Sequence, residues 1–315
     1  MAKRIVVVGS INLDLVAATD RIPIAGETVR GFSFRTFPGG KGANQAVAAA
    51  RLDGSVSMIG RLGSDAFGVE LRDSLEKSNV NTEAVQIVSG SSGVALITTD
   101  PQGENAITVV AGANAYLSPS SLDTNIELIR SAGILLTQLE IPLETVEHLA
   151  AIAAQEGVPL VLDPAPARAL PPSLLKRVEW LTPNETETSV LTGTGPGELS
   201  HESIEDAANT LLDRGSRNVI LKLGDRGCYV ALSDGTRQLL PAYSVKPVDT
   251  TAAGDAFNGA FAVALMNRQG PLESASWASA VAAISVTRPG AQASMPTAAE
   301  VDRFLEDCRS ARTSR

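Results

Sequence analysis

The chain has 315 residues, of which 44% are hydrophobic and 19% are charged, so it is too apolar and too weakly charged to be disordered. Its 26 basic and 35 acidic residues leave a net charge of −9, which argues against binding to nucleic acid or to anionic membranes. The two cysteines, Cys228 and Cys308, are too few for a disulfide framework. The two histidines, His148 and His201, are too few for a histidine-rich metal site.

Hydrophobic runs in the sequence are too short for a secretory signal or a membrane span. The apolar run near the N-terminus covers only residues 5–9, which is shorter than the hydrophobic region of a signal peptide. The most apolar longer stretch, residues 252–266, is interrupted by Asp255 and Asn258, whereas a spanning helix needs about 18 or more apolar residues in succession. We therefore expect a cytoplasmic protein.

Short β-branched runs alternate with longer helical patterns, which predicts βαβ units and a parallel sheet covered by helices on both faces. The predicted strands are residues 4–9, 56–60, 133–139, 159–163, 180–182, 219–223 and 228–232. The predicted helices are residues 43–52, 67–78, 143–155, 204–214, 254–266 and 272–287. The fold class is therefore α/β.

Two stretches in the first third of the chain break this alternation. They are residues 26–38 and residues 94–110, and in the second stretch two β-rich runs flank a polar turn at residues 100–105, as in a hairpin. We expect a separate small sheet, inserted as a lid into a single domain that covers residues 1–315. The lid should comprise approximately residues 14–38 and 92–111.

Polar side chains follow the first predicted strand. Asn12 and Asp14 come just after its carboxyl end, which is where open α/β sheets bind ligands. Both side chains are suited to sugar hydroxyls, and an Asx turn is the alternative for either residue taken alone. A dinucleotide site is disfavoured, because the fingerprint G-x-G-x-x-G is reduced here to Gly9.

A glycine-rich segment precedes the first predicted helix. Gly39, Gly40, Lys41 and Gly42 would let the backbone approach a ligand closely. The segment is not a Walker A loop, since that motif requires Ser or Thr directly after the lysine. A glycine-rich turn with a solvated lysine is the alternative.

In the segment 249–257, several small residues directly precede an apolar helical pattern. Free N–H groups at the start of that helix would bind an anion such as a phosphate. Asp255 stands in the first turn. It would either stabilise the helix start or act as a general base in phosphoryl transfer.

Two further motifs lie downstream of the middle of the chain. Asn184 and Glu187 have the spacing of a capping box at the start of a helix, and their oxygens would also suit a water-mediated magnesium site near nucleotide phosphates. Residues 222–227 follow a predicted strand as a hairpin turn.

Together these motifs resemble the ribokinase family of PfkB-type carbohydrate kinases over nearly the whole chain. The matching segments are residues 9–14, 26–28, 39–45, 112–114, 138–140, 164–167, 182–185, 249–255 and 290–294. The resemblance implies a ribokinase-like three-layer α/β/α sandwich with a mostly parallel central sheet and a small β-sheet lid. It implies ATP-dependent phosphorylation of D-ribose at the 5-hydroxyl, which gives D-ribose 5-phosphate and ADP.

The resemblance also implies roles for individual residues. The sugar site would contain Asn12, Asp14, Gly40, Lys41, Asn44 and Glu140, with Asp255 as the base and the N–H groups around Ala252, Ala253 and Gly254 as the anion hole. The ATP site would contain Asn184, Lys222, Gly224, Asp225, Gly227, Gly254 and Ser279, with Mg²⁺ held through water by Asn184 and Glu187. A potassium ion would lie at Asp249, Thr251, Ser285, Arg288, Gly290 and Ser294, mostly on backbone carbonyls. Two lids would pair into a homodimer.

Three positions depart from the family pattern. Asp163 stands where the family commonly has Asn, and Lys222 and Ser279 lie at variable positions of the nucleotide pocket; these departures bear on nucleotide preference and affinity rather than on the reaction.

Three other functions compete with ribose phosphorylation. One is a related kinase for deoxyribose, fructose, a nucleoside or a keto-deoxy sugar acid, although the polar pair Asn12 and Asp14 favours a polyhydroxy sugar. Another is a sugar-binding regulator without catalysis, which would need neither Asp255 nor the anion loop. A nicotinamide-dependent dehydrogenase lacks its glycine fingerprint here.

Overall fold

The computed structural model describes residues 4–195 and 199–313. Within these ranges, ten strands form one mostly parallel sheet in the order β14-β13-β12-β11-β10-β9-β1-β4-β5, with β6 pairing to β4. The strands are β1 (Arg4–Val8), β4 (Val56–Gly63), β5 (Val80–Asn81), β6 (Val85–Val88), β9 (Ala132–Thr137), β10 (Leu160–Leu162), β11 (Trp180–Leu181), β12 (Asn218–Lys222), β13 (Cys228–Ala231) and β14 (Arg237–Leu240).

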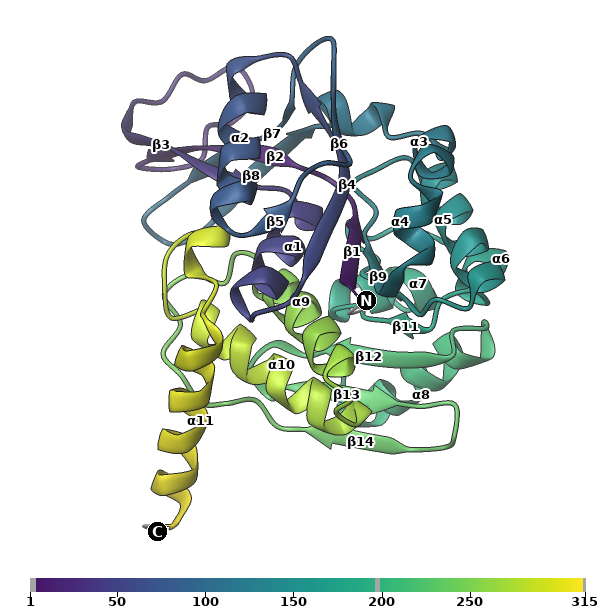
Figure 1. The fold of residues 1–315 in the computed structure, drawn as a ribbon. Coiled ribbons are helices and arrows are strands. Elements are labelled where there is room, and N and C mark those ends of the chain that lie inside the picture. Colours follow the sequence, from purple (N-terminus) through teal and green to yellow (C-terminus); the bar gives the residue numbers. More distant parts are fainter. Residues whose placement is uncertain (1–3, 196–198, 314–315) are drawn as a thin grey trace.

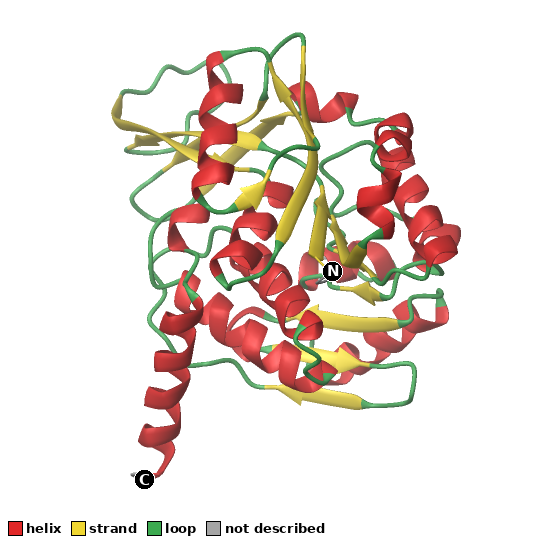
Figure 2. Cartoon of the chain, viewed as in Figure 1, coloured by secondary structure: helices red, strands yellow, loops and turns green. Residues whose placement is uncertain are grey.

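Helices cover both faces of this sheet (Figure 1, Figure 2). One face carries α1 (Lys41–Arg51), α2 (Ala66–Lys77), α9 (Ala253–Met266) and α10 (Pro271–Ser285), and α11 (Ala298–Thr313) packs against α10. The other face carries α3 (Pro119–Thr124), α4 (Ile126–Arg130), α5 (Leu143–Glu156), α6 (Pro172–Leu175), α7 (Glu185–Thr192) and α8 (His201–Asp213).

Strand β1 shows why the layers form. Its side chains alternate, so that Ile5 and Val7 join one buried apolar cluster and Val6 and Val8 join the other. A strand buried on both faces reads as a continuous apolar run, as the sequence does here. The predicted three-layer α/β/α architecture is confirmed.

The order of the strands creates a switch point at β1. The chain places β4 on one side of β1 and then returns to place β9 on the other side, followed by β10, β11 and β12. Open α/β sheets bind ligands at the carboxyl ends of the strands where the order reverses. The gap between the ends of β1 and β9 is therefore the expected centre of a site.

A second sheet stands at this end of the molecule (Figure 1). Its strands β2 (Asn12–Thr19), β3 (Gly31–Gly39), β7 (Gly93–Thr99) and β8 (Asn105–Val110) are ordered β3-β2-β7-β8. β7 and β8 are antiparallel, which confirms the hairpin predicted for residues 94–110. Asn12 and Asp14 lie within β2, so the alternative of an Asx turn is wrong for both.

Other local predictions are confirmed with small changes in their ends. β12 and β13 form the predicted antiparallel hairpin around residues 222–227. The strand predicted at residues 133–139 ends at Thr137, which leaves Gln138 and Glu140 just beyond the sheet. In the described part of the chain, no helix is long and apolar enough to cross a membrane.

Candidate active site

Residues from five neighbouring strands line one edge of the main sheet. Glu140, Asp163 and Asn184 follow β9, β10 and β11, while Lys222 ends β12 and Asn12 follows β1. Parallel strands bring their carboxyl ends to the same edge, so these residues form one continuous row. The row runs from the predicted sugar residues at β1 and β9 to the predicted nucleotide residues at β11 and β12.

Glu140 organises the sugar end of this row. Its Oε2 accepts hydrogen bonds from Ser10 Oγ at 2.6 Å and from the Lys41 backbone N–H at 3.1 Å, and lies 3.5 Å from Asn12 Nδ2. Asn114 Nδ2 donates to Asn12 Oδ1 at 2.7 Å. The structure thus brings Asn12, Lys41 and Glu140 together, and it adds Ser10 and Asn114, to which the sequence analysis gave no role.

The glycine-rich segment packs tightly against the end of β1. Gly40 has a φ of +86°, and a Cβ at this position would lie 2.6 Å from the Asn12 nitrogen. A Cβ on Gly42 would lie 2.7 Å from the Ser10 nitrogen. Only glycine fits such contacts, so the glycine-rich segment is held firmly against the end of β1.

Asp255 lies in the first turn of α9 and is only 5% exposed. Asn44 Nδ2 donates to its Oδ2 and Gln45 Nε2 donates to its Oδ1, both at 3.0 Å. Burial, assisted by the Asp163 carboxylate and opposed by the Lys41 ammonium, raises the pKa of Asp255 to about 6. A base with a pKa near the working pH is efficient in proton transfer, so the geometry fits a general base.

The other ionisable groups at the sugar end influence one another. Burial and the carboxylates of Glu140 and Asp255 raise the pKa of Asp14 to about 7. Burial lowers the pKa of Lys41, but Asp255, Asp163 and Glu140 outweigh this effect and raise it above its ordinary value. Asn44 Oδ1 is buried and has no hydrogen-bond partner among the described residues.

The N-terminus of α9 offers backbone N–H groups next to Asp255. Its N-cap residue, Ala252, has a φ of +59°, and no described side chain caps the helix. The first N–H groups of a helix have no partner within the helix, and the helix dipole favours an anion there. The Ala253 N–H donates to Thr250 O at 3.3 Å, so the amide that can receive a phosphate is that of Gly254, the next residue in the turn.

The nucleotide end contains the predicted capping box. Asn184 Oδ1 accepts from the Glu187 N–H at 2.8 Å, and Glu187 Oε2 accepts from the Asn184 N–H at 2.7 Å. Burial raises the pKa of Glu187, against the influence of the Lys222 ammonium. Lys222 Nζ lies 2.9 Å from Asp163 Oδ1.

The remaining predicted ATP residues lie beside the end of β12. Gly224, Asp225 and Gly227 form the turn between β12 and β13. Ser279 on α10 lies next to this hairpin, since its Oγ is 3.6 Å from Cys228 Sγ on β13.

Asp249 joins two of the segments that contain predicted potassium residues. Its carboxylate accepts from the Thr251 N–H at 2.9 Å and from the Gly290 N–H at 2.8 Å, which ties residues 249–251 to residues 288–290. Burial alone would raise the pKa of Asp249, but these hydrogen bonds outweigh it and hold the pKa below its ordinary value. The Arg288 side chain pairs with Glu300 at 2.6 Å.

The serines of the predicted potassium set each donate to a nearby carbonyl. Ser285 Oγ donates to Ala282 O and Ser294 Oγ donates to Ala291 O, each at 2.8 Å. Each hydroxyl hydrogen therefore points to a carbonyl three residues earlier in the chain.

Comparison with known proteins shows the family to which the chain belongs. A model of the pfkB family of carbohydrate kinases matches residues 2–298. The chain belongs to the pfkB family of carbohydrate kinases. It is 40% identical to the ribokinase of Haemophilus influenzae over 307 residues, which cover 97% of this chain and 99% of the relative.

Two further proteins are similar over nearly the whole chain. The chain is 38% identical to the deoxyribokinase of Salmonella typhi over 304 residues, covering 96% of this chain and 98% of the relative. The structure of Arabidopsis thaliana ribokinase complexed with ribose and ATP matches with a TM-score of 0.90 and 36% identity, covering 97% of this chain and 99% of that one.

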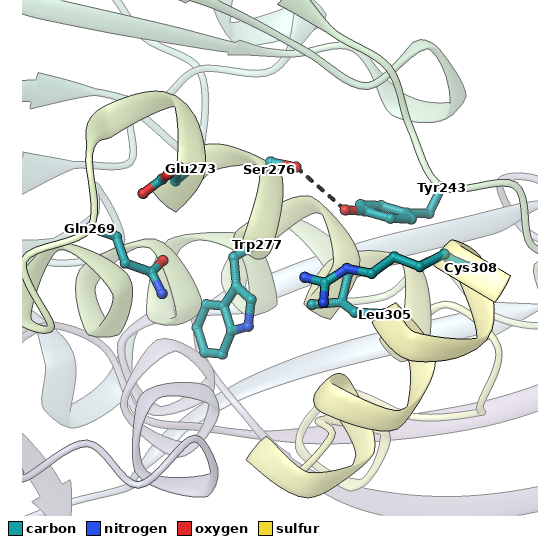
Figure 3. Close-up of a pocket in the computed structure, with 8 residues that line it drawn as sticks. Tyr243, Gln269, Glu273, Ser276, Trp277, Leu305 and Cys308 are labelled. Carbon is teal, nitrogen blue, oxygen red and sulfur yellow. Dashed lines mark hydrogen bonds between the residues drawn. The ribbon is translucent and has the colours of Figure 1, made fainter. Parts of the chain in front are cut away.

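This pfkB-family kinase also has a cavity of about 480 Å³ away from the row of site residues. It lies between α10, α11 and the segment after β14. Tyr243 Oη is 3.4 Å from Ser276 Oγ there, and Trp277 and Leu305 also line the cavity (Figure 3). None of the predicted site residues lines it.

Proposed function

We propose that this carbohydrate kinase transfers the γ-phosphoryl group of ATP to the 5-hydroxyl of D-ribose, giving D-ribose 5-phosphate and ADP. The observation that carries the proposal is the position of Asp255, which lies in the first turn of α9 and accepts hydrogen bonds from Asn44 and Gln45 of α1. Full-length similarity to ribokinases supports ribose as the acceptor. Because its co-substrate is ATP, we also infer a cytoplasmic location.

Recognition of ribose would depend on short polar side chains. Asn12, Asp14 and Asn44 offer amide and carboxyl groups within one wall of the site, while Gly40 allows the sugar to approach the backbone closely. With its pKa raised to about 7, Asp14 can donate a hydrogen bond to a sugar oxygen when protonated and accept one when ionised. Such a set suits several hydroxyls rather than an apolar base.

In the transfer step, Asp255 would take the proton of the 5-hydroxyl as this oxygen attacks the γ-phosphorus atom. The bond from the sugar oxygen to phosphorus forms, the bond from phosphorus to the β-γ bridging oxygen breaks, and ADP leaves with that electron pair. Negative charge on the phosphoryl oxygens would be stabilised by the N–H groups around Ala252, Ala253 and Gly254. Asn44 and Gln45 hold the base in line through their 3.0 Å hydrogen bonds.

The capping box fits a magnesium ion held through water. Glu187 uses Oε2 for the cap and is buried at the nucleotide end, which leaves Oε1 to orient a water bound to the metal. Asn184, at the start of the same helix, adds a second polar group. Mg²⁺ would supply charge neutralisation on the β- and γ-phosphates.

The loops joined by Asp249 fit a potassium ion. Hard cations prefer oxygen ligands such as carbonyls, and the structure ties the segment of Asp249 and Thr251 to that of Arg288 and Gly290. Ser285 and Ser294 complete the proposed set. The ion would stabilise the loop that leads into the anion-binding N-terminus of α9.

The small sheet supports a homodimer. Phe32 and Phe34 on β3 are 63% and 65% exposed, and Ile107 and Val109 on β8 are 55% and 52% exposed. β3 and β8 are also the edge strands of this sheet, and exposed apolar edges are templates for pairing. Light scattering should give twice the mass of the chain, and Phe34→Asp should shift it towards the monomer. A monomeric parent protein would contradict the dimer.

The acceptor is tested by ADP release from MgATP with D-ribose, 2-deoxy-D-ribose and D-fructose, compared as kcat/KM. We expect the highest value with D-ribose. The similarity to a deoxyribokinase makes 2-deoxy-D-ribose the second candidate. A higher kcat/KM with 2-deoxy-D-ribose or fructose would keep the kinase chemistry and reject ribose as the preferred substrate.

A further inference from the structure

A buried ion pair crosses the row of site residues between the sugar end and the nucleotide end. Lys222 at the end of β12 and Asp163 at the end of β10 lie 2.9 Å apart, and their side chains are 13% and 3% exposed. Desolvation makes a buried ion pair a weak source of stability. Its placement between two halves of an active site points to a role in the reaction.

The position of the ammonium group indicates what it would contact. Lys222 Nζ lies 3.2 Å from the place that a Cβ on Gly254 would take, so it stands directly beside the N-terminal turn of α9. The helix N-terminus and the ammonium thus favour an anion at the same point. An ammonium has three N–H donors, and the bond to Asp163 uses one of them.

Asp163 also connects to the catalytic base. Its Oδ2 accepts from Gln45 Nε2 at 3.0 Å, and the same nitrogen donates to Asp255 Oδ1 at 3.0 Å. Gln138 Nε2 donates to Gln45 Oε1 at 2.6 Å and so fixes the orientation of the Gln45 amide. Both Asp163 oxygens therefore have defined partners: Oδ1 pairs with Lys222, and Oδ2 accepts from Gln45, which also donates to Asp255.

We propose that Lys222 contacts the phosphoryl group that is transferred, and that Asp163 is a positioning residue which acts through Lys222. The inference rests on the proposed phosphoryl transfer with Asp255 as the base. Lys222 keeps its proton throughout: it stabilises charge on the phosphoryl oxygens, while the proton of the sugar hydroxyl goes to Asp255 and the electron pair of the broken P–O bond leaves with ADP.

Nucleotide binding tests the contact without any sugar. Calorimetry would compare Mg²⁺ with ADP and Mg²⁺ with a non-hydrolysable β,γ-methylene analogue of ATP, on the parent protein, Lys222→Gln and Asp163→Asn. Hydrogen bonds to charged groups contribute roughly 1.5–3 kcal/mol, so we expect Lys222→Gln to raise the Kd for the triphosphate analogue by about tenfold or more and that for ADP by much less. Equal weakening of both nucleotides would overturn the proposal. Since no acceptor is present, this result stands even if ribose is not the substrate.

Kinetics at pH 8 test whether Asp163 acts through Lys222. In the parent protein, Asp163→Asn should lower kcat by about tenfold while KM for the sugar stays within twofold. In a Lys222→Gln background, Asp163→Asn should have almost no further effect on kcat, because the group it positions is gone. Independent, multiplicative losses would overturn the positioning role.

Two double variants test whether a loss of activity or binding comes from misfolding. The double variant Asp163→Asn with Lys222→Gln replaces the buried ion pair by two amides, and we expect it to fold even if the single Asp163→Asn does not. Glu179 and Arg217 form a partly exposed ion pair of 3.3 Å. Both residues lie at the amino ends of β11 and β12, away from the row of site residues. The matched control, Glu179→Gln with Arg217→Gln, should leave both Kd values and kcat within twofold of the parent.

Discussion

Asp14 should make the protein less stable as the pH rises, and Asp14→Asn should remove this effect. Burial and the neighbouring carboxylates raise the pKa of Asp14 from 3.8 to about 7 in the folded protein. The folded state therefore holds the proton over a range in which the unfolded state releases it. The stability that Asp14 contributes is complete below about pH 4 and is lost as the pH rises to about 7.

The size of the effect follows from the shift. One pKa unit corresponds to about 1.4 kcal/mol, so a shift of about three units, discounted for the partial exposure of Asp14, gives on the order of 3 kcal/mol. Urea unfolding of the parent protein and of Asp14→Asn, measured from pH 4 to pH 8, would report this difference. We expect the two free energies of unfolding to be similar at pH 4 and the variant to be more stable by that amount at pH 8.

A control variant separates burial from a general loss of negative charge. Asp20 is exposed just after the end of β2, and Asp20→Asn should follow the parent protein across the whole pH range. The reasoning is refuted if the difference between Asp14→Asn and the parent does not change with pH, or if it is largest at pH 4.

Three further predictions concern the site and its surroundings. Because the pKa of Asp255 is raised to about 6, kcat should fall by about tenfold for each pH unit below that value; a pH–rate profile that is flat between pH 5 and 7 would contradict this. Gly40→Ala should lower the free energy of unfolding by about 1–3 kcal/mol in urea titrations and raise KM for the sugar. The reason is that Gly40 has a φ of +86° and a Cβ there would lie 2.6 Å from the Asn12 nitrogen. An unchanged free energy of unfolding and an unchanged KM would contradict this strain. Burial raises the pKa of Cys228 to about 11, so iodoacetamide at pH 8 should modify Cys308 first, as read by mass spectrometry, and equal labelling would contradict the burial of Cys228.

The sequence was most informative where a function depends on a few adjacent residues. The glycine-rich segment at Gly40, the start of α9 at Asp255 and the capping box at Asn184 are all local patterns, and the structure places them as predicted. The alternation of strands and helices predicted the α/β class and a mostly parallel sheet, but not the order of the strands within that sheet. The short strands β5 and β14 were not predicted, because two to four residues carry little periodic signal, although the equally short β11 and β13 were.

Contacts between distant residues could not be predicted in this way. Gln45 lies 118 positions from Asp163 and 210 positions from Asp255, yet it donates to both. Ser10 and Gln138 likewise lie inside recognisable motifs, but their partners became visible only in the folded chain. Such networks depend on the packing of α1 against α9 over the ends of the strands, which no spacing along the sequence records.

The central claim is that Asp255 activates the 5-hydroxyl of D-ribose for attack on ATP. Its most direct test is ADP release from MgATP with D-ribose in potassium buffer at pH 8, measured for the parent protein and for Asp255→Asn. We expect ribose-dependent turnover by the parent protein and a kcat lower by about 10²- to 10⁴-fold in the variant, with phosphorus NMR showing the phosphate on the 5-oxygen. Near-normal turnover by Asp255→Asn, or phosphate on another oxygen, would contradict the account.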